Sequence, residues 1–157
     1  MKNTIARTAL AVIFAAGLIA SMAAPAHAWD WQPPCSLAGA AGHWSLTDTG
    51  SVIGIGPRTA VGVFTLDGNG NLLNGVAASS LNGTVAQETF SGTYAVNPDC
   101  SGSFDVKIYS AGAELFELTA FIAFDEHMRH MRAVFTSVVT PGGVALPSVI
   151  SLDATKQ

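Results

Sequence analysis

The chain has 157 residues, only 11% of them charged, with eleven acidic and seven basic side chains and a formal net charge of -4. This balance leaves no basic stripe to displace the counterions of phosphate, so the composition disfavours nucleic-acid binding. Few charges are available for a polar active site, so we expect any pocket to be mainly apolar.

The first residues have the pattern of a secretory signal peptide. Basic Lys2 and Arg7 precede an apolar run over 9–20, and the small-residue sequence Ala-His-Ala follows at 26–28. We expect a signal peptide over 1–28, and hence a periplasmic or secreted protein of about 129 residues forming one domain. Cleavage would remove two of the seven basic residues, leaving five against eleven acids and a net charge of -6. No later stretch reaches the roughly 20 apolar residues of a membrane-spanning helix.

The two cysteines, Cys35 and Cys100, both follow the predicted cleavage site. Because an exported chain meets an oxidising compartment, we expect them to form one disulfide. Closing a loop of about 66 residues would stabilise the fold by roughly 4 kcal/mol in the chain-entropy model. Two thiols without a nearby histidine do not make a tetrahedral metal site, and we expect no metal and no cofactor.

Residues 29–41, which include Pro33 and Pro34, predict an extended lead. From residue 42 onward, β-branched and aromatic runs alternate with turn signals such as Asp67-Gly68-Asn69-Gly70-Asn71 and Asn82-Gly83. This pattern predicts an all-β domain over 42–157, an eight-stranded antiparallel up-and-down barrel with one disulfide. A two-sheet sandwich of the same strands is the alternative. The predicted strands are 43–51, 58–66, 72–81, 84–95, 101–109, 114–125, 130–139 and 146–154.

Period-two alternation predicts which face of each strand is buried. Phe104, Val106 and Ile108 share one face, and alternate residues from Phe116 to Phe124 share another. A hairpin near residues 127–128 would place Met131, Ala133 and Phe135 beside the second set.

The first predicted strand opens with Gly42-His43-Trp44, which resembles the Gly-x-Trp signature of lipocalins and other calycins. The resemblance implies that Trp44 is structural and plugs the closed end of a barrel, with its indole N–H bonded to a partner. The preceding Cys35-Ser36-Leu37 resembles the start of an avidin-type barrel. Avidins use several tryptophans for biotin, whereas the others in this chain, Trp29 and Trp31, precede the barrel, so we do not expect biotin binding.

The segment from Phe90 to Gly102 is similar to small exported bacterial β-barrel proteins, a mostly uncharacterised group. Barrels of the lipocalin type hold one small apolar molecule, whereas those of the allene oxide cyclase type enclose a reacting lipid. The resemblance therefore implies a lumen site but does not choose between carrier and enzyme.

We expect the only cluster of ionisable groups in the chain to be Asp125-Glu126-His127-Met128-Arg129-His130. A turn places His127 and His130 apart, so a solvated turn with His130 opposite Asp125 is the favoured interpretation over a metal or proton-transfer site. Asp67 to Asn71 is similar to part of a calcium loop, but a hairpin turn explains it fully.

Two residues are candidate proton-transfer groups, Glu117 and Tyr94. Glu117 and Arg132 fall on the face opposite the apolar set, so we expect Glu117 to be an ordinary surface charge. If that face instead lined the lumen, burial would raise the pKa of Glu117 and suit it to acid–base chemistry.

The aromatic side chains that alternate along the strands are either core or lumen-lining. Their positions make six of them candidate ligand contacts: Phe64, Tyr94, Phe104, Phe116, Phe124 and Phe135.

Together these features predict an exported barrel that binds a small apolar molecule, such as a lipid, terpenoid or aromatic compound. The alternatives are a cofactor-free cyclase or isomerase in the same lumen, and a surface or matrix protein with an apolar patch on the barrel exterior. Sequence does not choose an oligomeric state.

Overall fold

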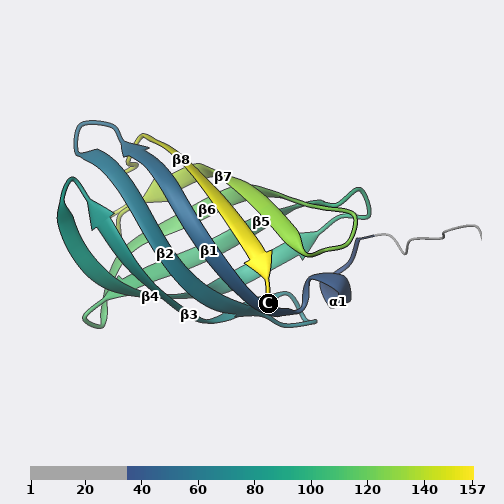
Figure 1. The fold of residues 1–157 in the computed structure, drawn as a ribbon. Helices are drawn as coiled ribbons and strands as arrows, with labels where there is room; N and C mark the ends of the chain where they lie inside the picture. Colours follow the sequence, from purple (N-terminus) through teal and green to yellow (C-terminus); the bar gives the residue numbers. More distant parts are fainter. Residues whose placement is uncertain (1–34) are drawn as a thin grey trace, which may run out of the picture. The chain divides into compact units, whose positions relative to one another are not determined.

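The computed structural model describes residues 35–157 (Figure 1). The predicted signal peptide, Trp29, Trp31 and the start of the predicted lead lie outside the described residues. One short helix, α1 (Leu37–Ala40), precedes eight strands: β1 (Gly42–Val52), β2 (Gly56–Leu66), β3 (Asn71–Leu81), β4 (Thr84–Val96), β5 (Ser101–Ser110), β6 (Ala113–Phe124), β7 (His130–Val139) and β8 (Ser148–Lys156).

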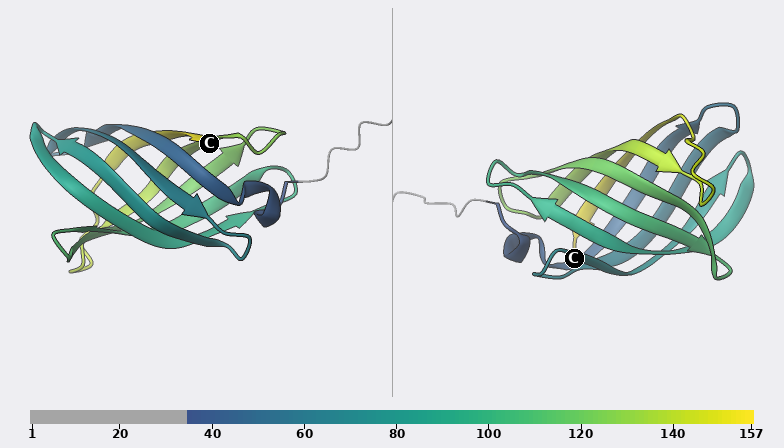
Figure 2. Two further views of the ribbon diagram at one scale, coloured as in Figure 1. Left: turned by 60° about the horizontal axis from the view of Figure 1, so that its bottom comes forward. Right: turned by 180° about the vertical axis from the view of Figure 1, so that it is seen from behind.

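The strands form a closed barrel in sequence order, in which every strand is antiparallel to the next and β1 pairs with β8. Figure 2 shows the barrel from two further sides. The predicted eight-stranded barrel is therefore confirmed and the sandwich is excluded. Within residues 35–157, no helix has the length and apolar character needed to span a membrane.

The helix α1 differs from the extended lead predicted for 29–41. The Ser36 side chain caps it by accepting a hydrogen bond from the Gly39 backbone N–H at 3.1 Å. Ser at this position satisfies one of the unpaired amides of a helix start, and three of the following residues, Leu37, Ala38 and Ala40, are good helix formers. The lead therefore becomes one helical turn at one end of the barrel, which we call the α1 end.

Inward-facing glycines allow the strands to curve. A Cβ at Gly50 or Gly92 would lie 2.0 Å from a carbonyl oxygen of the neighbouring strand, and one at Gly62 would lie 2.4 Å from another. Only glycine allows these close approaches, and glycine kinks of this kind let a sheet close into a barrel.

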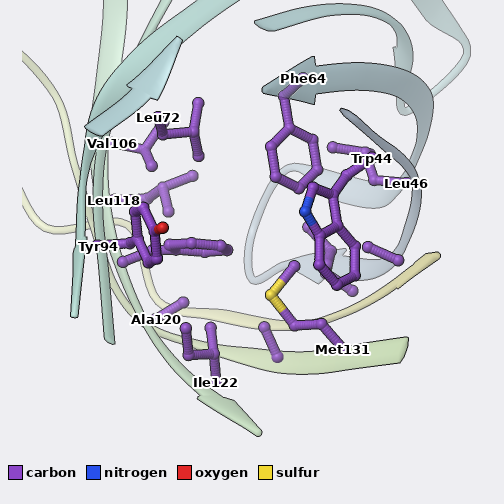
Figure 3. Close-up of a cluster of buried hydrophobic side chains, with 14 of the residues drawn as sticks. Trp44, Leu46, Phe64, Leu72, Tyr94, Val106, Leu118, Ala120, Ile122 and Met131 are labelled. Carbon is purple, nitrogen blue, oxygen red and sulfur yellow. The ribbon is translucent and has the colours of Figure 1, made fainter. Parts of the chain in front are cut away.

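Figure 3 shows a cluster of buried hydrophobic side chains inside the barrel, which includes Trp44, Phe64 and Tyr94. Its aromatic members fill the α1 end. Trp44 is fully buried, and its indole N–H donates to the Ala40 carbonyl of α1 at 2.9 Å. Its ring stacks on Phe64 and meets Phe124 edge-on. The structure thus places Trp44 as a plug whose polar atom is satisfied by the helix that covers it.

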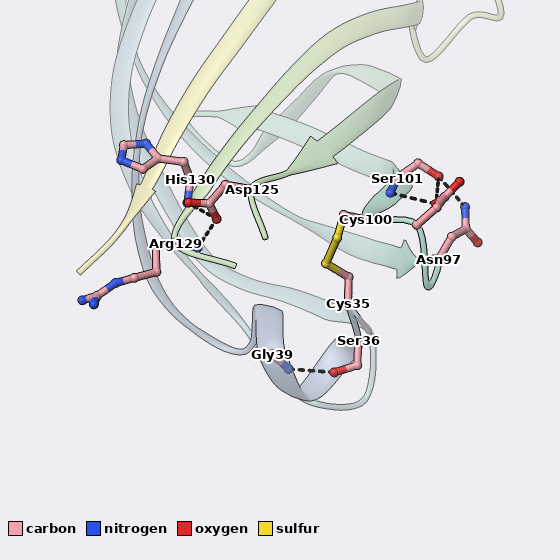
Figure 4. Close-up of a disulfide and its surroundings, with 10 residues drawn as sticks. Cys35, Ser36, Gly39, Asn97, Cys100, Ser101, Asp125, Arg129 and His130 are labelled. Atoms are coloured by element: carbon pink, nitrogen blue, oxygen red, sulfur yellow. Dashed lines mark hydrogen bonds between the residues drawn. A yellow bond between two sulfur atoms is a disulfide. The ribbon is translucent and has the colours of Figure 1, made fainter. Parts of the chain in front are cut away.

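The disulfide Cys35–Cys100 joins the chain just before α1 to the turn between β4 and β5 (Figure 4). This predicted disulfide is therefore confirmed. In the neighbouring β6–β7 turn, Asp125 Oδ1 accepts hydrogen bonds from the backbone N–H groups of Arg129 and His130. The disulfide and the hydrogen-bonded turns hold the α1 end in place.

Candidate functional site

The lumen contains a cavity of about 40 Å³. This exceeds what one water molecule requires. Three charged side chains, Asp48, Arg58 and Glu88, share the lining with apolar ones from all eight strands: Leu46, Ala60, Phe64, Leu72, Ala77, Phe90, Phe104, Val106, Ile108, Leu118, Phe135 and Leu152.

The charged side chains form one hydrogen-bonded cluster, which we call the lumen ion cluster (Asp48, Arg58, Ser79 and Glu88). Arg58 Nη1 and Nη2 donate to the two carboxylate oxygens of Glu88 at 3.1 and 2.9 Å, a bidentate pair. Arg58 Nη2 also donates to Asp48 Oδ2 at 3.3 Å, and Ser79 Oγ donates to Glu88 Oε1 at 2.7 Å. Arg58, which lies on β2, thus links Asp48 on the neighbouring strand β1 to Glu88 on β4.

Each member of this cluster is removed from solvent. Asp48 and Glu88 are 4% exposed and Arg58 is 6% exposed. Two atoms nevertheless have no hydrogen-bond partner within the described protein, Asp48 Oδ1 and Arg58 Nε. A buried polar atom without a partner costs free energy, so these two atoms mark a place where a polar group of a guest molecule would gain hydrogen bonds.

The pKa values of Asp48 and Arg58 are both raised in this cluster, for different reasons. Burial raises the pKa of Asp48 above its ordinary value, and the attraction of Arg58 opposes this effect without cancelling it. Burial works against the charge on Arg58, but its hydrogen bond to Glu88 and the attraction of both carboxylates raise its pKa. Arg58 therefore stays charged, with Glu88 as its principal partner.

Two aromatic rings border the cluster. Phe116 lies 5.7 Å from the Arg58 guanidinium carbon, a cation–π contact on the side of the cluster away from the α1 end. Phe90 lines both the lumen cavity and a groove on the outer wall beside Asn74 and Gly75. It lies where the β3–β4 register shifts between Leu72 and Gly75, so its ring separates the lumen from the outside at a bulge in the wall.

The six aromatics predicted as ligand contacts divide into two groups. Phe64, Phe104 and Phe135 line the cavity. Tyr94 and Phe124 pack in the aromatic cluster at the α1 end, and Phe116 covers Arg58, so these three lie outside the cavity lining. The structure adds Phe90, which the sequence analysis did not select.

Glu117 lies on the outer wall, with 53% of its side chain exposed, and makes an ion pair with Lys107 at 3.8 Å. Arg132, predicted on the same outer face, pairs with Asp153 instead. The structure thus places Glu117 on the outward face that the alternation favoured.

Tyr94 is buried at the α1 end, away from the cavity. Its hydroxyl lies within hydrogen-bond distance of the backbone carbonyls of Asp67, at 2.6 Å, and Leu37, at 3.1 Å. Burial, with a smaller contribution from the Asp67 carboxylate, raises its pKa to about 12. The Tyr94 hydroxyl therefore anchors α1 and the 67–71 turn to the barrel.

The two turns considered as metal sites are held by their own carboxylates. Asp67 accepts hydrogen bonds from the backbone N–H groups of Asn69 and Asn71 and from the Asn71 side chain, which lowers its pKa. In the β6–β7 turn, the two backbone hydrogen bonds to Asp125 lower the pKa of that carboxyl against the effect of burial. Among residues 35–157, no group of three or more His, Cys, Asp and Glu side chains is placed to hold a metal ion.

One expectation about charge was wrong. The 125–130 turn is not the only cluster of ionisable groups, because the barrel register brings Asp48, Arg58 and Glu88 together inside. The pocket is mainly apolar, as expected, with these three charged side chains in its lining. The sequence does contain a signal for this buried cluster. Each of these residues is in phase with inward-facing neighbours, such as Leu46 for Asp48 and Ala60 for Arg58, but three charges distant in sequence show their partnership only once strands are paired.

The outer wall carries an apolar patch of exposed valines on β2 and β3. Val63 lies directly opposite Val76 in the β2–β3 ladder, and Val61 lies opposite Ala78. The three valines are each more than 40% exposed. This patch is a feature of the outer wall, separate from the lumen.

No protein-family model matches the chain, and no curated protein matches it. Solved structures are similar to it at low sequence identity. A structure of EF1p2_mFAP2b bound to DFHBI has a TM-score of 0.49 and 14% identity, covering 76% of this chain and 94% of that one. A redesigned β barrel has a TM-score of 0.44 and 16% identity, covering 78% and 95%.

Proposed function

We propose that this protein is an exported carrier that holds one small, mostly apolar molecule in the barrel lumen. The observation that carries the proposal is the cavity itself, which is lined by apolar side chains and contains one buried polar cluster. Ligand sites in proteins combine apolar walls with a few placed polar groups in this way. The cavity of about 40 Å³ is smaller than the roughly 150 Å³ cavity that takes up benzene in an engineered protein, so a guest of one ring or a short branched chain binds only as the lining side chains shift.

The distribution of charge over the loops supports access by an apolar compound. The turns at the α1 end carry Asp67, Asp99 and Asp125, among other charged residues. At the opposite end, the segments 53–55, 82–83, 111–112 and 140–147 contain no charged residue. Ile53 and Ile55 are exposed there. An apolar compound approaching this end therefore displaces no strongly hydrated groups.

Export is part of the proposal. The 1–28 pattern and the disulfide Cys35–Cys100 support it, because disulfides persist in oxidising compartments. Cell fractionation and intact mass measurement test it. We expect the protein in the periplasm or medium with Trp29 as its first residue, and a cytoplasmic chain that retains residues 1–28 would contradict export.

Native mass spectrometry of protein purified gently from its own host tests the carrier function. We expect a complex of one protein with one small molecule, which denaturing extraction then releases. Ala60→Leu fills the cavity and should abolish the complex, whereas Ala95→Leu, at an exposed position on the outer face of β4, should preserve it. A bare protein mass, or a bound mass that survives Ala60→Leu, would contradict the proposal.

A second function, a cofactor-free isomerase or cyclase acting in the same lumen, is favoured by Asp48. This carboxyl borders the cavity and its pKa is raised by burial, as suits a general acid or base. The test is to incubate the extracted compound with the protein in deuterated water. An enzyme would convert the compound or exchange its carbon-bound protons for deuterium through Asp48, and a carrier would return it with those protons unchanged.

A further inference from the structure

In the lumen ion cluster, one acceptor atom and one donor atom lack a hydrogen-bond partner within the described protein. Asp48 Oδ1 accepts hydrogen bonds and Arg58 Nε donates one, and neither has a partner within the described protein. Each lies two covalent bonds from an atom of the 3.3 Å contact between Arg58 Nη2 and Asp48 Oδ2. The two unfilled positions therefore flank a single ion pair that borders the cavity.

The charge of the cluster restricts the chemistry of a guest group at this point. One guanidinium already faces two carboxylates, so a guest anion would be repelled by the excess negative charge. An ammonium group would donate to Asp48 Oδ1 but could accept nothing from Arg58 Nε. A hydroxyl group does both, because it donates one hydrogen bond and accepts others while remaining neutral.

We propose that the lumen selects a small apolar molecule bearing a hydroxyl group, which donates to Asp48 Oδ1 and accepts from Arg58 Nε. This inference rests on the proposed carrier function and specifies its ligand class. The apolar side of the cavity, including Phe64, Phe104 and Leu118, holds the hydrocarbon part. A pure hydrocarbon would leave both polar atoms buried without hydrogen bonds, at a cost in free energy, whereas a hydroxyl group pairs them. The hydroxyl therefore gives selectivity as well as affinity.

The test compares phenol with toluene, which has nearly the same shape but a methyl group in place of the hydroxyl, and with anisole, which accepts hydrogen bonds but donates none. Dissociation constants come from backbone amide chemical shifts in an NMR titration of the protein. We expect phenol to bind roughly tenfold tighter than toluene or anisole, with shifts at lumen residues such as Ala60 and Val106. Toluene binding in the lumen as tightly as phenol would overturn the hydroxyl inference and leave the carrier function standing.

Two variants complete the test. Asp48→Leu removes the accepting carboxylate at similar volume and leaves Arg58 paired with Glu88, so the preference for phenol over toluene should fall to about twofold or less. Glu117→Gln, which changes a carboxylate on the outer wall, should keep the full preference. An unchanged preference in a folded Asp48→Leu protein would overturn the inference. If neither probe shifts lumen residues, the carrier function and the inference both fail, and the unfilled atoms bind only water.

Discussion

At the scale of single residues, Arg58 is important for stability because it is the counter-ion of two buried carboxylates. Arg58→Met would leave Asp48 and Glu88 facing each other without a counter-ion, and we expect a loss of about 3–5 kcal/mol in the free energy of unfolding. Asp48→Leu removes a buried charge while Glu88 still pairs with Arg58, so its effect should stay within about 1 kcal/mol. Urea denaturation measures both, and equal losses would contradict this division of roles.

Tyr94 makes a second residue-scale prediction, in alkaline solution. Its pKa is about 12 in the folded protein against an ordinary value of 10.0. Because the unfolded chain releases this proton first, Tyr94 contributes stability that is complete below pH 10 and is lost as the pH rises through 12. Absorbance titration should show a tyrosine step near pH 12 that Tyr94→Phe removes. The variant should also lose less stability than the unmodified protein between pH 10 and pH 12.

At the scale of the strands, curvature depends on glycines that face inward. Gly92→Ala places a Cβ 2.0 Å from the Asp105 carbonyl oxygen of β5, and backbone must shift to relieve the clash. We expect it to destabilise the barrel by about 1–3 kcal/mol. Gly68→Ala is the matched control, because nothing lies within 4 Å of the added atom. Thermal unfolding followed by circular dichroism compares them, and equal midpoints would contradict the role of Gly92.

The disulfide makes a prediction at the same scale. Cys35–Cys100 closes a loop with a sequence separation of 65, so its loss should cost about 4 kcal/mol in the chain-entropy model. The paired substitution Cys35→Ser with Cys100→Ser, compared with the oxidised protein in urea denaturation, measures this loss. Because Trp44 still donates to Ala40, the variant should keep its barrel spectrum in the absence of denaturant. A loss below about 1 kcal/mol would show that α1 holds its place without the covalent link.

Strand-level features were predictable because they are local. Each observed strand boundary lies within two residues of its prediction, since turn residues such as Asn82-Gly83 end strands through their own backbone preferences. The helix α1 was missed because a four-residue turn has no apolar period, and only the Ser36 cap signals it. The lumen ion cluster was missed because Asp48, Arg58 and Glu88 meet only through strand register.

At the scale of the whole molecule, the barrel has two different ends around one interior. The α1 end is filled by Trp44, Phe64 and Phe124 and fastened by a disulfide, while the loops of the other end carry no charge within the described residues. The cavity and the lumen ion cluster lie between them. This arrangement supports the proposed carrier, in which the apolar walls would provide affinity and the lumen ion cluster would provide selectivity.

The most direct test of this account is a crystal structure of the protein soaked with phenol. The account predicts one phenol molecule in the lumen, with its hydroxyl oxygen within hydrogen-bond distance of Asp48 Oδ1 and Arg58 Nε and its ring against Phe64 and Phe104. A lumen that contains only water molecules, or phenol bound solely on the outer wall, would contradict it.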